Sequence, residues 1–314
     1  MRLRLLALAL LSGCAGLPGA RPPEAPPEAL PWPAERADAA LQARVATLAE
    51  AFDGRVGVYA RHLPTGRTLA LRADSLFPTA SMVKVPILIA TMAAVDRGDL
   101  ALDQTLVFRD SLRYDDHGLI GLLRDGSAVA VHSAVETMLS ASDNNSSLWL
   151  QALSGGGEAI NGMLAARGYA ATRVNSRTPG RRADWEAYGW GQTTPREMAR
   201  LIREIVDADV DVVSPGADEE MHRMLTRTFW DDEALAAIPP GVQVASKQGA
   251  VSDSRSEVLY VHAPSGPYVL CVVTDGQADT SWGADNAGFV FLREVSAAVW
   301  AAWEPGSLWR PADP

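Results

Sequence analysis

Lysine, cysteine and histidine are scarce in this chain of 314 residues. Two cysteines and five scattered histidines form no cluster with the spacing of metal ligands, so we expect neither a metal nor a cofactor. The net charge of −10 and the lack of a basic stripe exclude a nucleic-acid partner. The apolar run near the N-terminus, residues 5–11, is too short to span a bilayer, which needs about 20 residues.

The rest of the composition is that of an ordinary soluble globular protein, with 47% hydrophobic and 21% charged residues. A chain of this length can bury a large core, as one big domain or two interleaved ones. We expect it to act as a monomer. Cys271 lies in the apolar run 268–273, which predicts a buried core thiol.

The first residues are predicted to be a targeting segment. A charged start, "MRLR", is followed by the short apolar run, which is typical of a signal peptide over residues 1–13. The run ends in Leu11-Ser12-Gly13-Cys14, which resembles a bacterial lipoprotein signal cleaved before a cysteine that then carries lipid. The alternative is a plain secretory signal in which Cys14 is incidental. Both alternatives imply export.

Residues 14–33 are predicted to be a lipidated cysteine followed by a tether. Seven prolines in residues 15–33 prevent packing and favour a semi-rigid extended chain. Such a tether would hold a catalytic domain off a bacterial membrane, in the periplasm or outside the cell membrane.

The remaining chain is predicted to form an α+β fold. Periodicity and turn residues predict helices at 34–52, 80–96 and 287–303, strands at 55–62, 68–72, 242–247, 257–262 and 268–274, and a long helical or irregular middle. Strands at both ends favour one antiparallel sheet built from the N- and C-terminal segments and flanked by helices, with an inserted all-helical domain. The predicted catalytic domain is 34–306, with an α/β part at 34–76 and 242–306, a helical part at 77–241, and a tail at 307–314. Clefts form at such domain junctions.

The two lysines, Lys84 and Lys247, stand against 26 arginines. Codon bias explains why lysine is scarce but not where it is kept. Lysine and arginine differ where a compact ammonium or a neutral amine is needed. With Thr79 as N-cap, Ser81 lies in the first turn of a helix and Lys84 one turn later on the same face. This pattern is typical of a nucleophile with its own base.

Two further motifs follow. Ser142-Asp143-Asn144 is either part of a site or an ordinary helix N-cap. Lys247-Gln248-Gly249 comes at the predicted end of a strand, where the lysine offers a cation and Gly249 an unobstructed backbone edge along which a substrate could lie.

Taken together, the three motifs resemble those of the penicillin-recognising serine hydrolases, most closely class A β-lactamases, over roughly residues 40–305. The resemblance implies that Ser81 is the acylated nucleophile and Lys84 its base or proton relay. It also implies that Ser142 passes a proton to the leaving nitrogen, while Lys247 polarises Ser142 and attracts the substrate carboxylate.

The same resemblance implies several binding residues. Asn144 would hold the substrate amide, and the backbone N–H groups of Ser81 and Ala250 would form the oxyanion hole. Arg255 falls where this family often places a carboxylate-binding arginine; the alternative is a residue on the sheet surface. Tyr114 would line the cleft entrance, although core packing explains it equally well.

The sequence departs from the family at two points. Gln248 stands where the family usually has Thr or Ser, whose hydroxyl binds the substrate carboxylate. The family's deacylating Glu falls near Thr178, whereas the nearest Glu in this loop, Glu186, comes about eight residues later. Glu186 is therefore either a displaced base or a solvated loop carboxylate.

These features predict an exported serine hydrolase that is acylated at Ser81 by β-lactams or related amides, with slow deacylation as an open question. The first alternative is a D-Ala-D-Ala peptidase-like penicillin-binding protein acting on peptidoglycan-derived substrates. The second is a non-catalytic β-lactam-sensing or wall-binding lipoprotein.

Overall fold

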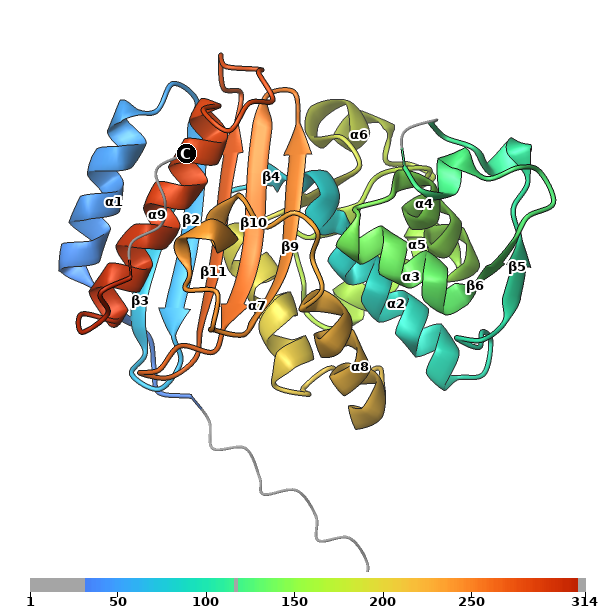
Figure 1. The fold of residues 1–314 in the computed structure, drawn as a ribbon, viewed down its shortest axis with the longest axis horizontal. Helices are drawn as coiled ribbons and strands as arrows, with labels where there is room; N and C mark the ends of the chain where they lie inside the picture. The colour runs from blue at the N-terminus through green and yellow to red at the C-terminus, as the bar shows by residue number, and fades with distance from the viewer. Residues whose placement is uncertain (1–31, 116–117, 310–314) are drawn as a thin grey trace, which may run out of the picture. The chain divides into compact units, whose positions relative to one another are not determined.

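The main sheet joins the two ends of the chain. The computed structural model describes residues 32–115 and 118–309. The six strands of the main sheet have the order β1-β3-β2-β11-β10-β9. Strand β2 (Arg55–His62) pairs antiparallel with β11 (Tyr268–Asp275), so N- and C-terminal segments lie side by side (Figure 1). The predicted α+β fold is confirmed.

The other strands of this sheet are β1 (Arg36–Ala37), β3 (Arg67–Leu71), β9 (Val244–Val251) and β10 (Ser254–Val261). Neighbouring strands are antiparallel except β1 and β3, which pair in parallel.

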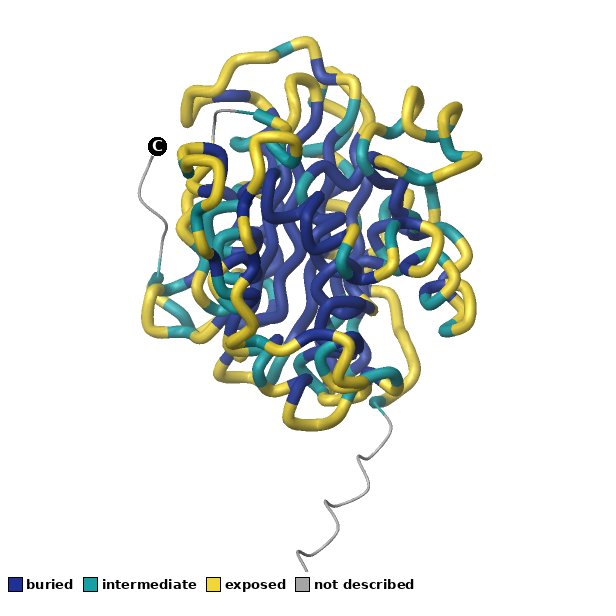
Figure 2. The backbone as a smooth tube through the Cα atoms, turned by 90° about the vertical axis from the view of Figure 1, so that its right-hand side faces the viewer, coloured by how far each residue is buried: buried dark blue, intermediate teal, exposed yellow. Residues whose placement is uncertain are grey.

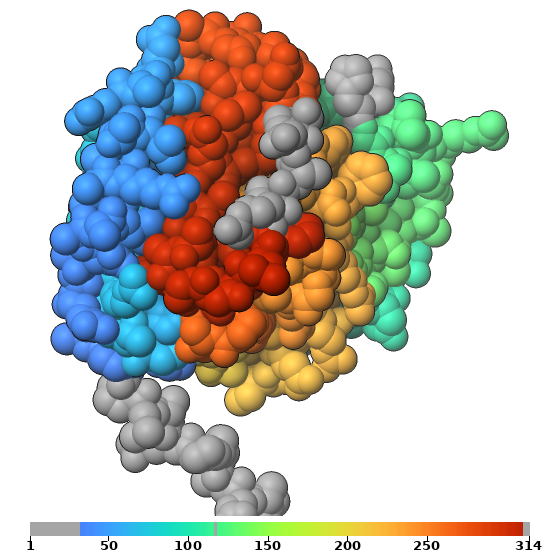
Figure 3. All heavy atoms as spheres, turned by 60° about the vertical axis from the view of Figure 1, so that its left-hand side comes forward, coloured from blue at the N-terminus to red at the C-terminus, as the bar shows by residue number. Residues whose placement is uncertain are grey.

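Both faces of the sheet carry a hydrophobic core, because side chains alternate along each strand. Val58 of β2 belongs to the core that also contains residues of α1 (Ala39–Ala51) and α9 (Ala287–Trp303). Its neighbour Tyr59 belongs to the core on the other face, beneath α7 (Pro195–Val206) and the helical part. Figure 3 shows the blue N-terminal segment against the red C-terminal helix on the first of these faces.

The helical part is built around α2 (Lys84–Asp96), whose residues are almost all buried. A helix that is apolar on every side lies in the centre of a domain. The helices that contact it are α3 (Val131–Ser140), α4 (Asn144–Leu153), α5 (Gly156–Ala166), α7 and α8 (Pro215–Leu225). Figure 2 shows the buried positions gathered along the middle of the trace and the exposed ones in the outer loops.

Short elements connect these layers. They are β4 (Phe77–Pro78), β5 (Thr105–Val107), β6 (Ala128–Ala130), β7 (Arg173–Val174), β8 (Gly191–Thr193), α6 (Arg182–Tyr188) and the 3-10 helices η1 (Ala80–Val83), η2 (Asp110–Leu112), η3 (Ile120–Leu122) and η4 (Ala234–Ala237). The middle of the chain, predicted as helical or irregular, therefore also contains two small sheets.

The first helix begins later than predicted. Residues 34–37 are not helical, because Arg36 and Ala37 pair with β3 instead. Asp38 then caps α1 by accepting a hydrogen bond from the backbone N–H of Leu41 at 3.3 Å. A parallel pairing with a strand that is distant in the sequence leaves no local pattern from which it could be predicted.

Two other predicted boundaries are wrong near the site. The helix expected from residue 80 is a 3-10 turn, η1, before α2 starts at Lys84, and the side chain of Thr79 makes no capping hydrogen bond. Strand β9 continues to Val251, so Lys247-Gln248-Gly249 lies within the strand rather than at its end.

The folded part extends beyond the predicted limits of 34–306. Trp32 packs against one core and donates a hydrogen bond to Asp207 at 3.0 Å, and Trp309 packs against the other. The predicted signal peptide, Cys14 and most of the tether lie outside the described residues. Among residues 32–115 and 118–309, no helix is both long and apolar enough to cross a membrane.

Candidate active site

Ser81 lies on a turn that is pressed against the sheet edge. Ala80, just before it, has a φ of 43°, a left-handed conformation that is costly for a residue other than glycine. Gly249 of β9 allows the close approach, because a Cβ there would lie 2.8 Å from both the N of Ser81 and the O of Thr79. Ser256 donates a hydrogen bond to that same Thr79 carbonyl at 3.2 Å. The sheet therefore fixes the position of Ser81.

Lys84 is buried at the centre of the site. Its Nζ lies 3.0 Å from Ser81 Oγ, 3.0 Å from Ser142 Oγ and 3.1 Å from Asn144 Oδ1. Burial, followed by the charge of Lys247, holds the pKa of Lys84 well below its usual range, although Asp143 and Asp115 oppose this. A neutral amine at this distance can accept the proton of Ser81.

Ser142 connects the two lysines. Its Oγ lies 3.0 Å from Lys84 Nζ and 3.1 Å from Lys247 Nζ. Its φ of 59° is again left-handed. The next residue, Asp143, caps α4 by accepting a hydrogen bond from the backbone N–H of Ser146 at 2.7 Å. Asp143 is therefore the N-cap of α4, and the residues on either side of it contact Lys84; their part in a reaction stays a prediction.

Lys247 lies near a pair of buried acids, Glu233 and Glu257, that belong to none of the three sequence motifs. Burial lowers the pKa of Lys247 to about 7, while Glu233 and Glu257 act in the opposite direction. Burial raises the pKa of Glu257 to about 7 and that of Glu233 well above its usual range. One carboxylate oxygen of each acid has no hydrogen-bond partner among the described residues. A glutamate inside the strand 254–261 was the available sequence clue.

Gln248 is turned back onto Lys247. Its Oε1 accepts a short hydrogen bond from Lys247 Nζ, and its carbonyl accepts a second at 2.9 Å. It lines the same cavity as Ser81, Ser142 and Ala250. The amide oxygen of Gln248 therefore helps to fix the position of the Lys247 side chain.

Arg255 is fully buried, so the sheet-surface alternative is wrong. Its terminal nitrogens donate to the backbone carbonyls of Val251, Ser254 and, at 2.6 Å, Ser281. The rings of Trp282 and Phe289 lie 4.5 and 4.6 Å from its guanidinium carbon. These contacts tie the β9–β10 hairpin to the segment before α9, and carboxylate binding by Arg255 stays a prediction.

The resemblance described above places the deacylating glutamate near Thr178, in the loop 175–190. Thr178 donates a hydrogen bond to the carbonyl of Ser176 at 3.0 Å and packs against Gly157 of α5, where a Cβ would lie 1.8 Å from its Oγ1. Glu186 is exposed and forms an ion pair with Arg182 at 2.6 Å. It nevertheless lines a cavity that also contains Ser81.

Two cavities meet at Ser81. One cavity, of about 660 Å³, is lined by Ser142, Gln248 and Glu233 as well as by Ser81. The other, of about 590 Å³, lies on the side of Tyr114, which is half exposed and contacts Trp190 edge-on at 5.0 Å. Within residues 32–115 and 118–309, no group of three or more His, Cys, Asp or Glu side chains could hold a metal ion.

Comparisons with known proteins find relatives both in sequence and in structure. A protein from Streptomyces fradiae described as "Beta-lactamase" is 27% identical over 266 residues, which are 79% of this chain and 84% of that protein. The solved structure of PBP-A is 26% identical with a TM-score of 0.77, covering 87% of this chain and 99% of that chain.

A crystal structure of a beta-lactamase from Sphaerobacter thermophilus is also 26% identical, with a TM-score of 0.75 over 85% of this chain and 98% of that one. The model of the beta-lactamase enzyme family matches residues 40–303, most of the sequence. The chain therefore belongs to the beta-lactamase enzyme family.

Proposed function

We propose that this protein hydrolyses β-lactams through an acyl-enzyme formed at Ser81. The observation that carries the proposal is the buried amine of Lys84, which lies 3.0 Å from Ser81 Oγ and shares Ser142 with Lys247. The relatives named above are described as beta-lactamases or, for PBP-A, have a variant whose structure is described as an acyl-enzyme complex with penicillin G.

Acylation proceeds with three proton transfers. Ser81 Oγ attacks the lactam carbonyl carbon while its proton moves to Lys84 Nζ. The carbon–nitrogen bond then breaks, and the leaving nitrogen takes a proton from Ser142 Oγ. Ser142 is re-protonated from Lys84 Nζ at 3.0 Å or Lys247 Nζ at 3.1 Å. Water must then hydrolyse the Ser81 ester to release the acid.

The second candidate is a D-Ala-D-Ala peptidase-like enzyme whose β-lactam adduct persists. It is favoured by Thr178, which stands where family members carry the carboxylate that activates water. A time course with a chromogenic cephalosporin, followed by intact-mass spectrometry, separates the candidates. Steady hydrolysis supports the β-lactamase, a stable adduct the peptidase, and no adduct a binding protein.

We expect a burst of about one equivalent of product followed by slow turnover, because Glu186 is exposed, paired with Arg182 and displaced from the position that family members use. Catalytic groups tolerate misplacement of only about 0.5 Å. Glu186→Gln should therefore change neither phase. The matched control is Glu219→Gln, which removes an exposed carboxylate that is paired in the same way with Arg223, at 2.9 Å. Fast turnover that collapses in Glu186→Gln alone would identify Glu186 as the base.

We also propose that the protein is exported and held to a bacterial membrane through lipid on Cys14. The support is the sequence Leu11-Ser12-Gly13-Cys14 after a short apolar run. Expressed with its signal in a Gram-negative host, the wild type should fractionate with membranes, and Cys14→Ser should appear in the soluble fraction or the wrong compartment. Cys271→Ala, which changes only a buried thiol, should stay with the membranes. Soluble wild-type protein would contradict the anchor.

A further inference from the structure

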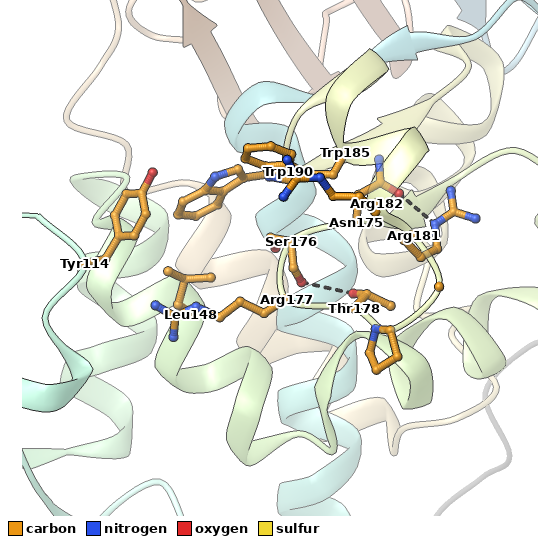
Figure 4. Close-up of a pocket in the computed structure, with 12 residues that line it drawn as sticks. Tyr114, Leu148, Asn175, Ser176, Arg177, Thr178, Arg181, Arg182, Trp185 and Trp190 are labelled. Carbon is orange, nitrogen blue, oxygen red and sulfur yellow. Dashed lines mark hydrogen bonds between the residues drawn. The ribbon is translucent and has the colours of Figure 1, made fainter.

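A pocket rich in arginine lies beside the cleft. It has a volume of about 550 Å³ and is formed by residues 175–182 together with Tyr114, Leu148, Trp185 and Trp190 (Figure 4). Its lining, among the described residues, contains three arginines and no acidic residue, although the chain as a whole carries a net charge of −10. Such a concentration of one charge in a concave site favours an anion. We name it the arginine pocket.

The three arginines differ in how far their charges are already compensated. Arg181 is held in place by the side-chain oxygens of Asn175 at 2.9 Å and Gln192 at 2.8 Å, and pairs with Asp184 at 3.3 Å. Arg182 is paired with Glu186, as described above.

The charge of Arg177 is not compensated by a neighbouring side chain among the described residues. Its side chain makes no hydrogen bond or ion pair with any residue in 32–115 or 118–309. Its φ of 47° is left-handed, a conformation that costs free energy for a side chain of this size. In Figure 4 its side chain extends across the pocket toward Tyr114. The pocket therefore presents one free guanidinium group.

The arginine pocket lies next to one of the two cavities that meet at Ser81. The cavity of about 590 Å³ that contains Ser81 shares Tyr114, Trp185 and Trp190 with it. Ser142, which under the proposed function protonates the leaving nitrogen, lines the opposite cavity. The leaving group must then occupy the cavity with Ser142, and the acyl substituent points toward the tryptophans.

We propose that the arginine pocket is a subsite for a carboxylate on the acyl side chain of the substrate, with Arg177 as the residue that binds it. The inference rests on the proposed function and adds a substrate class to it. A guanidinium group binds a carboxylate through two parallel hydrogen bonds. The rings of Tyr114 and Trp190, edge to face at 5.0 Å, provide an apolar wall for an aryl group next to that carboxylate.

Two penicillins that differ in one group test the proposal: one has a phenylacetyl side chain, the other an α-carboxyphenylacetyl side chain. The second-order acylation rate is measured for both by intact-mass spectrometry. Arg177→Asn removes the charge, and asparagine tolerates the left-handed backbone. We expect the acylation rate of this variant to fall about ten-fold for the carboxylated penicillin, as the loss of charge-assisted hydrogen bonds implies. Its acylation rate for the phenylacetyl penicillin should stay almost unchanged. The matched control is Arg223→Asn, which removes an exposed arginine of α8 that is paired with Glu219 and lies outside the arginine pocket; it should leave the ratio of the two rates unchanged.

An unchanged ratio in Arg177→Asn, with a wild-type melting temperature, would overturn the subsite while leaving the proposed function intact. If neither penicillin acylates the wild type, the proposed function fails, and the pocket is then tested by titrating phenylmalonate while following tryptophan fluorescence. Saturable binding that is lost in Arg177→Asn supports the anion subsite. Absent binding, or equal binding by both proteins, contradicts it.

Discussion

Ser81→Ala is expected to form no covalent adduct with any β-lactam, a complete loss rather than a reduced rate. The reason is chemical, because the substitution removes the oxygen that forms the ester and leaves Lys84 without a group to deprotonate. Its structural cost is small: among the described residues the hydroxyl takes part in one hydrogen bond, at 3.0 Å, whose net contribution to stability is about 1 kcal/mol. A domain of this size should then lose about 2–4 °C in melting temperature. Intact-mass spectrometry and a thermal melt measure both effects.

Ser147→Ala is the matched control for this experiment. Ser147 lies on α4, is fully buried, and its hydroxyl has no partner among the described residues, so its removal breaks no hydrogen bond. The Ser147 variant should form the adduct at the wild-type rate. An adduct on Ser81→Ala would end the assignment of the nucleophile, whatever the control does.

The elements that could be predicted from the sequence are those set by local patterns. The helix 287–303 and the strand 55–62 have the predicted bounds, because their periodicity is clear and turn or capping residues flank them. The strand β1 could not be predicted, since two residues become a strand only by pairing with β3. The 3-10 turn η1 likewise depends on the left-handed Ala80, which the packing of Gly249 against the turn stabilises.

The residues of the candidate site are likewise of two kinds: those in a local sequence motif and those that only the fold brings together. Ser81, Lys84, Ser142 and Lys247 can be proposed from the sequence, because fixed spacing and rare lysines single them out. In the structure the side chains of Ser81, Ser142 and the two lysines are linked by hydrogen bonds. The acids near Lys247 were missed because they come from different segments. Glu257 of β10 pairs with Gln248 of β9, and Glu233 precedes η4. Only the fold brings such groups together.

The role of Lys84 depends on an amine that can lose its proton. Burial and the neighbouring Lys247 both lower its pKa, so it is neutral above that lowered pKa and can accept the Ser81 proton. Acidification protonates it, so wild-type acylation should slow as the pH falls. Lys84→Arg replaces the amine by a guanidinium group, which stays charged at every accessible pH. We expect acylation to fall on the order of 10²-fold or more, measured as the rate of adduct formation.

Lys84→Met distinguishes the loss of the base from the effect of a larger side chain. Methionine fills a space similar to that of lysine but has no amine. The acylation rate of Lys84→Met should therefore fall as far as that of Lys84→Arg. If Lys84→Arg acylates at nearly the wild-type rate while Lys84→Met does not, residue 84 acts only as a cation and the base must be sought elsewhere. Ser142 is then the next candidate for the proton path, because its Oγ lies 3.1 Å from Lys247 Nζ.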